Sequence, residues 1–257
     1  MERKWTGAAV LAVVVLALAG LSVAQTATHA GARYDGQIQQ DVNQKLQQKD
    51  KLRGVSATSE DGIVTLTGTV EVYQDKVNAE KTARKVDHVA GVRNLVEVGP
   101  QVSDAQLQEE ISRKLRYDRV GHAPVFDSLT LAVQQGVVTV GGTVRDYPAR
   151  DVALADVRST AGVKDVVDEI KVAPLSPNDD RIRLAVARAV YGAGPLNRYA
   201  MDPAAPIRIV VVNGHVELDG QVNTELEKTV AGIQANSVPG VFSVKNNLMV
   251  AGSSEGD

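Results

Sequence analysis

The residues with the clearest capacity for chemistry are a group of bases near the middle of the chain. The group consists of Arg113, Lys114, Arg116 and Arg119, with Tyr117 among them. Because a lysine or arginine close to anionic lipid headgroups contributes roughly 1 kcal/mol, four such side chains predict a weak peripheral contact. The alternative is that these bases only match the negative end of a helix and pair with Asp118, Glu109 and Glu110.

A second candidate is the long, proline-bearing loop over residues 191–206. Its apolar side chains include Leu196, Tyr199 and Met201. A loop of this length in a compact domain is either packed down or functional. The three side chains would dip into a headgroup layer or dock on a partner. In the alternative, which we favour, the loop is a lid over the edge of a sheet.

Residues for catalysis or metal binding are scarce. The sequence has no cysteine and only four histidines, and His88 and His122 have no partner histidine at the spacing of a zinc site. The acid pairs Glu109-Glu110 and Asp179-Asp180 are placed at predicted helix starts, where solvated carboxylates match the helix dipole. Phosphate-loop, nucleophile-elbow, zinc-protease and dinucleotide motifs are absent. The sequence therefore predicts no catalytic residues, no metal and no cofactor, and a protein that is not an enzyme.

The overall charge and the first thirty residues point to a location. Thirty-one acids against 28 bases give a formal net charge of −3, which disfavours nucleic-acid binding because that requires an excess of positive charge. Residues 1–30 are typical of a secretory signal, with two bases before an apolar run over residues 8–23. An uncleaved inner-membrane anchor is the alternative, and in both cases the body lies in the periplasm. We expect residues 251–257 to form a disordered tail.

The body of the chain repeats one glycine-centred pattern three times. In each copy a second glycine lies six positions after the first, a valine follows two positions later, and a Gly-Val pair comes further on. The glycines are Gly62, Gly68 and Gly91 in the first copy, Gly136, Gly142 and Gly162 in the second, and Gly214, Gly220 and Gly240 in the third. The repeat predicts three similar units, over residues 35–102, 103–173 and 178–250.

Each copy is predicted to contain a helix, two strands, a second helix and a last strand. Apolar residues four apart mark one buried face of each opening helix. These residues are Ile38, Val42 and Leu46, then Leu107, Ile111 and Leu115, then Ile182, Val186 and Val190. The first glycine of each copy predicts a tight hairpin, and the inner glycine predicts a bulge or the close approach of a helix. The Gly-Val pair predicts a left-handed helix end that starts the last strand.

The second helices and the last strands have predicted buried positions as well. The second helix is expected to bury Ala79, Ala83, Val86 and Ala90 in the first copy, and Leu226, Val230 and Ile233 in the third. The last strand is expected over residues 163–172 and 241–250, and to stop after Val98 in the first copy, where Gly99-Pro100 follows. Cores of this size are individually marginal, so we expect packing between neighbouring units to add stability.

The repeated pattern resembles the BON domain, a family named after bacterial osmotically inducible and nodulation proteins. The resemblance rests on the glycine–valine string, on the later Gly-Val pair and on the triplication. It implies an α+β chain of three tandem small αββαβ domains, each a three-stranded mixed sheet with two helices on one face. It also implies an exported protein, linked to osmotic or envelope stress and associated with phospholipid or other envelope components. In some members the helix of the second unit contacts phospholipid.

These observations favour a non-enzymatic periplasmic protein that associates with anionic phospholipid surfaces, with the group of bases as the contact. The alternative is a protein-binding scaffold or holdase that shields exported proteins during osmotic stress. Self-association is compatible with both interpretations.

Overall fold

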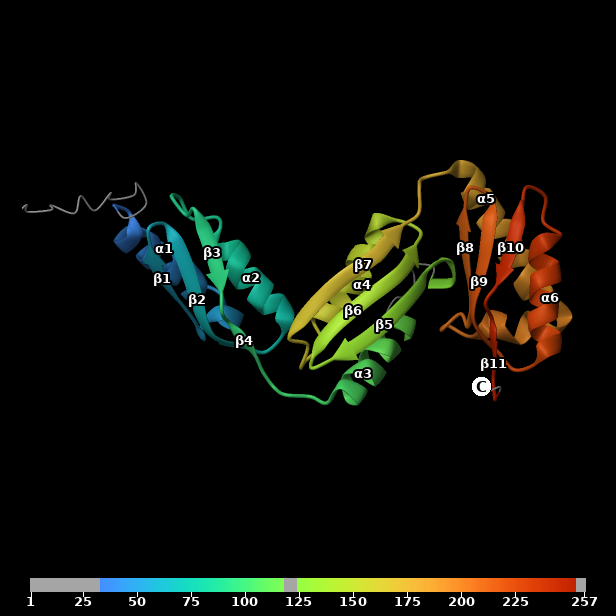
Figure 1. Cartoon of the computed structure of the whole chain (residues 1–257), viewed down its shortest axis with the longest axis horizontal. Helices are drawn as coiled ribbons and strands as arrows, with labels where there is room; N and C mark the ends of the chain where they lie inside the picture. The colour runs from blue at the N-terminus through green and yellow to red at the C-terminus, as the bar shows by residue number, and fades with distance from the viewer. Residues whose placement is uncertain (1–32, 118–123, 253–257) are drawn as a thin grey trace, which may run out of the picture.

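Three units of the same architecture follow one another in a row (Figure 1). The computed structural model describes residues 33–117 and 124–252, so the predicted signal or anchor segment and residues 253–257 of the predicted tail lie outside the described residues. Each unit contains the predicted order of helix, two strands, helix and last strand, which makes the chain an α+β protein with three small mixed sheets. Among the described residues, no helix is both long enough and apolar enough to cross a membrane.

The elements of the three units correspond one to one, apart from breaks in the last strand. Unit 1 contains α1 (Asp35–Gln47), η1 (Asp50–Leu52), β1 (Val55–Glu60), β2 (Ile63–Val70), α2 (Tyr73–Ala83), β3 (Gly91–Asn94) and β4 (Glu97–Val98). Unit 2 contains α3 (Asp104–Tyr117), η2 (Pro124–Phe126), β5 (Ser128–Gln134), β6 (Val137–Val144), α4 (Tyr147–Arg158) and β7 (Asp165–Val172). Unit 3 contains α5 (Pro177–Gly192), η3 (Gly194–Met201), β8 (Ile207–Val212), β9 (His215–Val222), α6 (Glu225–Asn236), β10 (Ser243–Asn246) and β11 (Met249–Val250).

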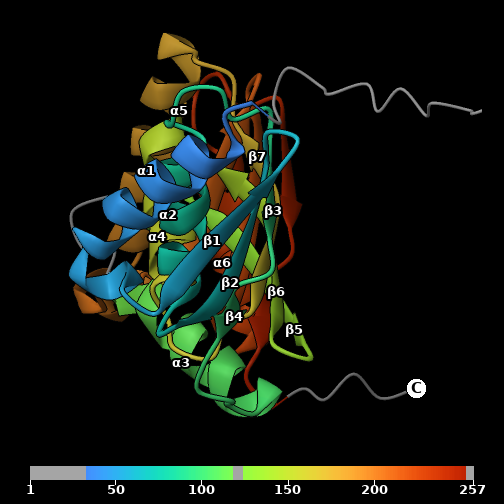
Figure 2. The same ribbon diagram turned by 90° about the vertical axis from the view of Figure 1, so that its left-hand side faces the viewer.

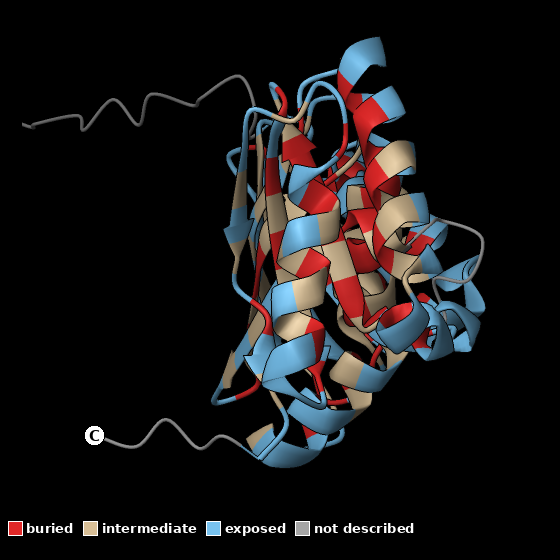
Figure 3. Ribbon diagram, turned by 90° about the vertical axis from the view of Figure 1, so that its right-hand side faces the viewer, coloured by how far each residue is buried: buried red, intermediate tan, exposed pale blue. Residues whose placement is uncertain are grey.

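The second strand is the centre of every sheet. It pairs antiparallel with the strand before it and parallel with the strand after the second helix. The helices of all three units lie on one side of the row and the sheets on the other (Figures 2 and 3). One face of each sheet is therefore packed under helices, while the other face is open.

The opening helices bury the predicted faces. All the predicted positions of α1, α3 and α5 are buried, and each set belongs to the core cluster of its own unit. The spacing by four keeps these side chains on one side of the helix, where they meet the inward residues of the central strand, such as Val64 and Leu66 in unit 1. Each unit thus has a separate core beneath its opening helix.

The second helices follow the prediction in unit 1 more closely than in unit 3. Ala79 and Ala83 of α2 are fully buried, although the helix ends at Ala83 and the predicted Ala90 is exposed beyond it. In α6 the predicted Val230 packs against the core, but the prediction is wrong for Leu226 and Ile233, which are 65 % and 61 % exposed. The buried face of α6 consists of Glu227, Ala231 and Ala235.

The hairpins adopt the predicted backbone conformations, whereas the inner glycines form neither the predicted bulge nor a contact with a helix. The residue before each hairpin glycine has a positive φ of 51–54°, followed by a glycine at 77–80°. The inner glycines also have positive φ, and a Cβ atom at Gly220 would lie 1.9 Å from the carbonyl oxygen of Pro206. The close approach thus comes from the backbone that precedes the first strand, not from a helix.

The Gly-Val pair of unit 1 does not correspond to those of the other units. Gly91 is opposite Ile63 in the sheet, in the place that Asp165 and Ser243 take in units 2 and 3. The counterpart of Gly162 and Gly240, which have positive φ, is His88, with φ of 67°. The sequence match to Gly91-Val92 is therefore three residues out of register, because a histidine replaces the expected glycine.

The last strand is interrupted in both outer units, whereas a continuous strand was predicted for unit 3. At the break in unit 3, the Asn246 side chain donates a 2.7 Å hydrogen bond to the carbonyl of Lys228 in α6 and accepts one from the backbone N–H of Leu248. Asn94 makes the equivalent hydrogen bonds in unit 1: its side chain donates to the carbonyl of Lys76 in α2 and accepts from the backbone N–H of Val96. After this break the strand continues as β4, which ends at Val98. The inward-turned residue after each break is only 1 % exposed.

Unit 2 has no such break, and β7 runs unbroken to Val172. The asparagine is replaced here by Asp168, which has no N–H to donate to a helix carbonyl. Its carboxylate forms an ion pair with Arg150 of α4 instead. The residue at this equivalent position is therefore an asparagine in the two interrupted strands and an aspartate in the regular one.

Candidate functional site

The joint between units 1 and 2 is built around Tyr73, the first residue of α2. Its ring packs against the core cluster of unit 2, and its hydroxyl is hydrogen-bonded to Asp165. Burial, with the bond to Asp165 and the charge of that carboxylate, raises the pKa of Tyr73 to about 12. The hydroxyl therefore stays protonated and donates. A β-bridge between Val72 and Ala161 completes the joint.

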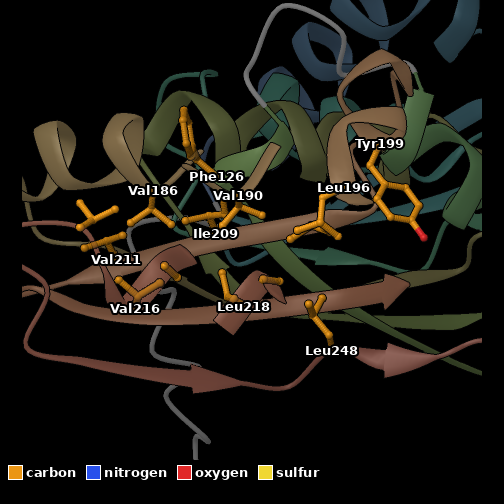
Figure 4. Close-up of a cluster of buried hydrophobic side chains, with 14 of the residues drawn as sticks. Phe126, Val186, Val190, Leu196, Tyr199, Ile209, Val211, Val216, Leu218 and Leu248 are labelled. Carbon is orange, nitrogen blue, oxygen red and sulfur yellow. The ribbon is translucent and has the colours of Figure 1, made fainter. Parts of the chain in front are cut away.

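The joint between units 2 and 3 is built differently. The short helical turn η2 of unit 2 contacts β8, the first strand of unit 3. Phe126, at the end of η2, is 8 % exposed and belongs to the same buried cluster as Val186, Val190 and Ile209 of unit 3 (Figure 4). Unit 2 thus contributes a core residue to unit 3.

The predicted group of bases lies at the C-terminal end of α3, on the helix side of the row. Arg113, Arg116 and Tyr117 are exposed, whereas Arg119 lies outside the described residues. The Lys114 side chain is only 20 % exposed, with its Nζ atom 3.9 Å from a carboxylate oxygen of Glu110. The alternative of charge matching therefore applies to Lys114, while Arg113 and Arg116 present their charges to solvent. Glu110 lies in the middle of α3 and not at its start.

A cleft of about 740 Å³ separates units 2 and 3 next to this helix end. Arg116 and Tyr117 line it from α3, and residues of strands β5 and β6 contribute to the same wall of unit 2. The opposite wall is the open face of the sheet of unit 3, with Arg208, Glu217 and Asp219. The bases of α3 therefore stand at the edge of a cleft that only the tertiary structure creates.

The charges inside the cleft have both signs. Glu217 faces Lys245 at 3.5 Å, and Asp219 accepts a 2.8 Å hydrogen bond from the side chain of Asn247. Carboxylates on this wall repel a phosphate group, so the cleft itself is a poor site for an anionic headgroup. The outer surface of α3, where Arg113 is exposed, is the better one.

The loop over residues 191–206 is packed down on unit 3. Its middle forms η3, in which Leu196 is fully buried and Tyr199 is 9 % exposed. The Tyr199 hydroxyl donates a 2.9 Å hydrogen bond to the buried carboxylate of Glu227 at the start of α6. Burial raises the pKa of Tyr191, which donates to the carbonyl of Ile207, to about 12.

This packing corrects the predicted loop contact. Leu196 and Tyr199 are parts of the core and are not available to a headgroup layer or a partner. Met201, which is 87 % exposed, is the member of the three that reaches solvent. The middle of the loop contacts α5 and α6, and the Tyr191 hydroxyl at its start bonds to the first residue of the outer strand β8.

The paired acids at the start of α5 have a structural role that the sequence reasoning missed. Asp179 is 1 % exposed and not solvated, and its carboxylate accepts hydrogen bonds of 2.9 Å from the backbone N–H groups of Asn213 and Gly214. Asp35 and Asp104 hold the hairpins of units 1 and 2 in the same way. The sequence feature that could have predicted this role is the aspartate near the start of every opening helix.

Groups suited to metal binding do not assemble in the described residues. No set of three or more histidine, cysteine or acidic side chains within them is placed to hold a metal ion. His88 stacks on Tyr34, with ring centroids 3.9 Å apart, and His215 contacts the hydroxyl of Ser243. What the arrangement offers is a charged surface beside a cleft.

Comparison with known protein families matches the BON domain three times, to residues 34–100, 103–174 and 178–252. No curated protein matches the chain. One similar solved structure is the C-terminal domain of CdsD, the structural protein of the Type III secretion system of Chlamydia trachomatis. It is 16 % identical, and the match covers 82 % of this chain and 96 % of that chain with a TM-score of 0.23.

A second similar structure is the periplasmic domain of PrgH, a type III secretion inner membrane protein from S. typhimurium. It is 12 % identical, and the match covers 78 % of this chain and 95 % of that chain with a TM-score of 0.21.

Proposed function

Because the chain belongs to the BON domain family, we propose that it is a non-enzymatic periplasmic protein that binds anionic phospholipid surfaces at the envelope. Membership of this family favours an envelope location and a role in osmotic or envelope stress. The proposed contact is the C-terminal end of α3, on the helix side of the row.

The observation that carries this proposal is the exposure of Arg113 and Arg116 at the end of α3. Both belong to the last turns of a helix whose inner face is held by the buried Leu107, Ile111 and Leu115. The guanidinium groups are therefore presented by a rigid element. Each cation near an anionic surface contributes about 1 kcal/mol, and this attraction decreases as salt screens it.

Flotation of the full chain with vesicles tests the proposal. We expect retention on vesicles that contain phosphatidylglycerol at low salt, and little retention on neutral phosphatidylcholine vesicles. The double variant Arg113→Gln/Arg116→Gln removes about 2 kcal/mol of attraction, which weakens binding about 30-fold. The matched control is Arg93→Gln/Lys171→Gln, which removes two exposed cations from β3 and β7 and leaves most of the binding.

Two results would overturn the proposal. One is an absence of retention on anionic vesicles at low salt. The other is equal binding by the α3 variant and the wild-type chain. Binding of an unfolded exported protein, without binding to either type of vesicle, would support the scaffold or holdase alternative in its place.

A further inference from the structure

The helix surface of unit 3 differs from those of the other units in its exposed aliphatic side chains. Leu184 of α5 is 48 % exposed, and Leu226 and Ile233 of α6 are 65 % and 61 % exposed. Over the described parts of α1, α2, α3 and α4, no large aliphatic side chain is exposed. Unit 3 therefore leaves large aliphatic side chains in water on its helices, where the described helices of units 1 and 2 expose none.

Two of these side chains lie on one face of α6. Leu226 and Ile233 are seven residues apart, which is about two helical turns, and both are exposed. Val230 lies between them in the sequence and packs against the core of unit 3. The buried face of α6 consists of Glu227, Ala231 and Ala235.

The neighbouring helix adds cations to this surface. On α5, Leu184 lies between Arg181 and Arg188, which are three residues before it and four residues after it, and all three are exposed. Helices α5 and α6 contact each other. Arginine side chains of this kind keep their charged ends in water while their methylene stems cover apolar surface.

An apolar stripe flanked by arginines fits the interface of an anionic bilayer. The apolar side chains enter the boundary between headgroups and acyl chains, and the arginines meet phosphate groups. A contact between two copies would instead take the charges of Arg181 and Arg188 out of water, which costs free energy unless acidic side chains face them. The helices of unit 3 also lie on the same side of the row as α3 (Figures 2 and 3).

We propose that the α5–α6 surface, made of Leu184, Leu226 and Ile233 with Arg181 and Arg188, inserts into the interfacial layer of an anionic membrane. This inference rests on the proposed function and adds a second point of contact to it. The end of α3 supplies electrostatic attraction, which salt screens, and the α5–α6 surface supplies hydrophobic attachment, which salt does not screen.

Binding measured at low and high salt distinguishes the electrostatic contribution of α3 from the hydrophobic contribution of the α5–α6 surface. The full chain and the variant Leu226→Gln/Ile233→Gln are compared by flotation with phosphatidylglycerol-containing vesicles at low and at high salt. We expect the wild-type chain to retain salt-resistant binding, and the variant to lose it by about tenfold or more. The matched control is Ile63→Gln/Leu95→Gln, which changes two exposed aliphatic side chains of unit 1 and leaves this binding unchanged.

A second measurement keeps the inference testable if the glutamine variant is poorly folded. The chain has no cysteine, so Ile233→Cys creates a single site for an environment-sensitive fluorophore. Its emission is expected to shift to shorter wavelength when anionic vesicles are added, while the same label at Leu95→Cys shows no shift.

Salt-resistant binding that survives the α6 substitutions, or a label at position 233 that stays in water, would overturn the inference. A change in oligomeric state without a change in vesicle binding would assign this surface to a second copy, and would overturn it too. Sensitivity to the Arg113→Gln/Arg116→Gln pair is measured independently, so the inference can fail while the proposed function stands.

Discussion

Units 1 and 3 share their internal architecture but differ in how they attach to unit 2. Both hold the hairpin with an aspartate from the opening helix, and both interrupt the last strand after an asparagine. Unit 1 places one of its own side chains, Tyr73, against unit 2. Unit 3 instead receives Phe126 from unit 2. At the first joint unit 1 supplies the packing side chain, and at the second joint unit 2 supplies it to unit 3.

The difference concerns equivalent positions of the repeat. Leu52 ends the helical turn before the first strand of unit 1 and is buried in the core of that unit. Phe126 ends the corresponding turn of unit 2 but lies in the cluster of unit 3. Unit 3 therefore depends on its neighbour for part of its core, and unit 1 does not.

Replacement of Phe126 is expected to give the largest effect. If it left unit 3 unchanged, units 1 and 3 would not differ in their dependence on unit 2. Phe126→Ala removes a buried aromatic side chain, at a cost of about 3–5 kcal/mol. Because the side chain lies in the cluster of unit 3, we expect amide exchange in α5 and β8 to accelerate. The control Leu52→Ala should accelerate exchange in unit 1 alone. Loss of protection confined to unit 2 after Phe126→Ala would contradict this assignment.

The aspartates that bind the hairpin amides give a second, smaller difference in stability between units 3 and 1. Asp179→Ala leaves the N–H groups of Asn213 and Gly214 without their acceptor in a buried place, which costs about 1–3 kcal/mol. Asp35→Ala exposes its partner amides to water, so unit 1 should lose less free energy of unfolding. Urea unfolding of both variants, followed by hydrogen exchange at the hairpins, measures the two losses. Equal losses would mean that burial does not set the difference.

The hydroxyl of Tyr73 tests the joint between units 1 and 2. Tyr73→Phe removes the hydrogen bond to Asp165 and weakens the docking of unit 1 by about 1 kcal/mol. Distances between spin labels on Thr58→Cys and Thr130→Cys should then become more broadly distributed. Tyr147 is the counterpart in unit 2 and is 67 % exposed, so Tyr147→Phe should leave the distribution unchanged. An unchanged distribution in both variants would show that the ring alone holds the joint.

The smallest expected effect is the response of unit 1 to acid. Hydrogen bonds from Ser59 and from the backbone of Gly62 hold the pKa of Asp35 below its ordinary value of 3.8. The unfolded chain therefore binds the proton first, so this aspartate stabilises unit 1 above pH 3.8 and the stabilisation is lost as the pH falls through the folded pKa. Unfolding of unit 1 followed between pH values on both sides of 3.8 should show this loss, and Asp35→Asn should reduce it.

Much of the fold was predictable because its determinants are local. The spacing by four in α1, α3 and α5 identifies their buried faces, and each hairpin is marked by its glycine. The register of the last part of unit 1 was not predictable, because His88 takes a left-handed conformation that the pattern assigns to glycine. The exposed bases of α3 were visible in the sequence, but the cleft beside them was not, since its second wall comes from unit 3.

The amino-acid pattern by itself determined the triplication, the αββαβ order and the faces of the opening helices, because each depends on residues close together in the chain. The tertiary structure alone decided which face of α6 is buried and where Phe126 packs. In α6 the helix lies close to the sheet, and a Cβ atom at Gly232 would lie 3.0 Å from the side chain of Asn246. Small residues fit at that distance, so alanines turn inward and Leu226 and Ile233 face solvent, a choice set by the space between two elements and not by the periodicity of either.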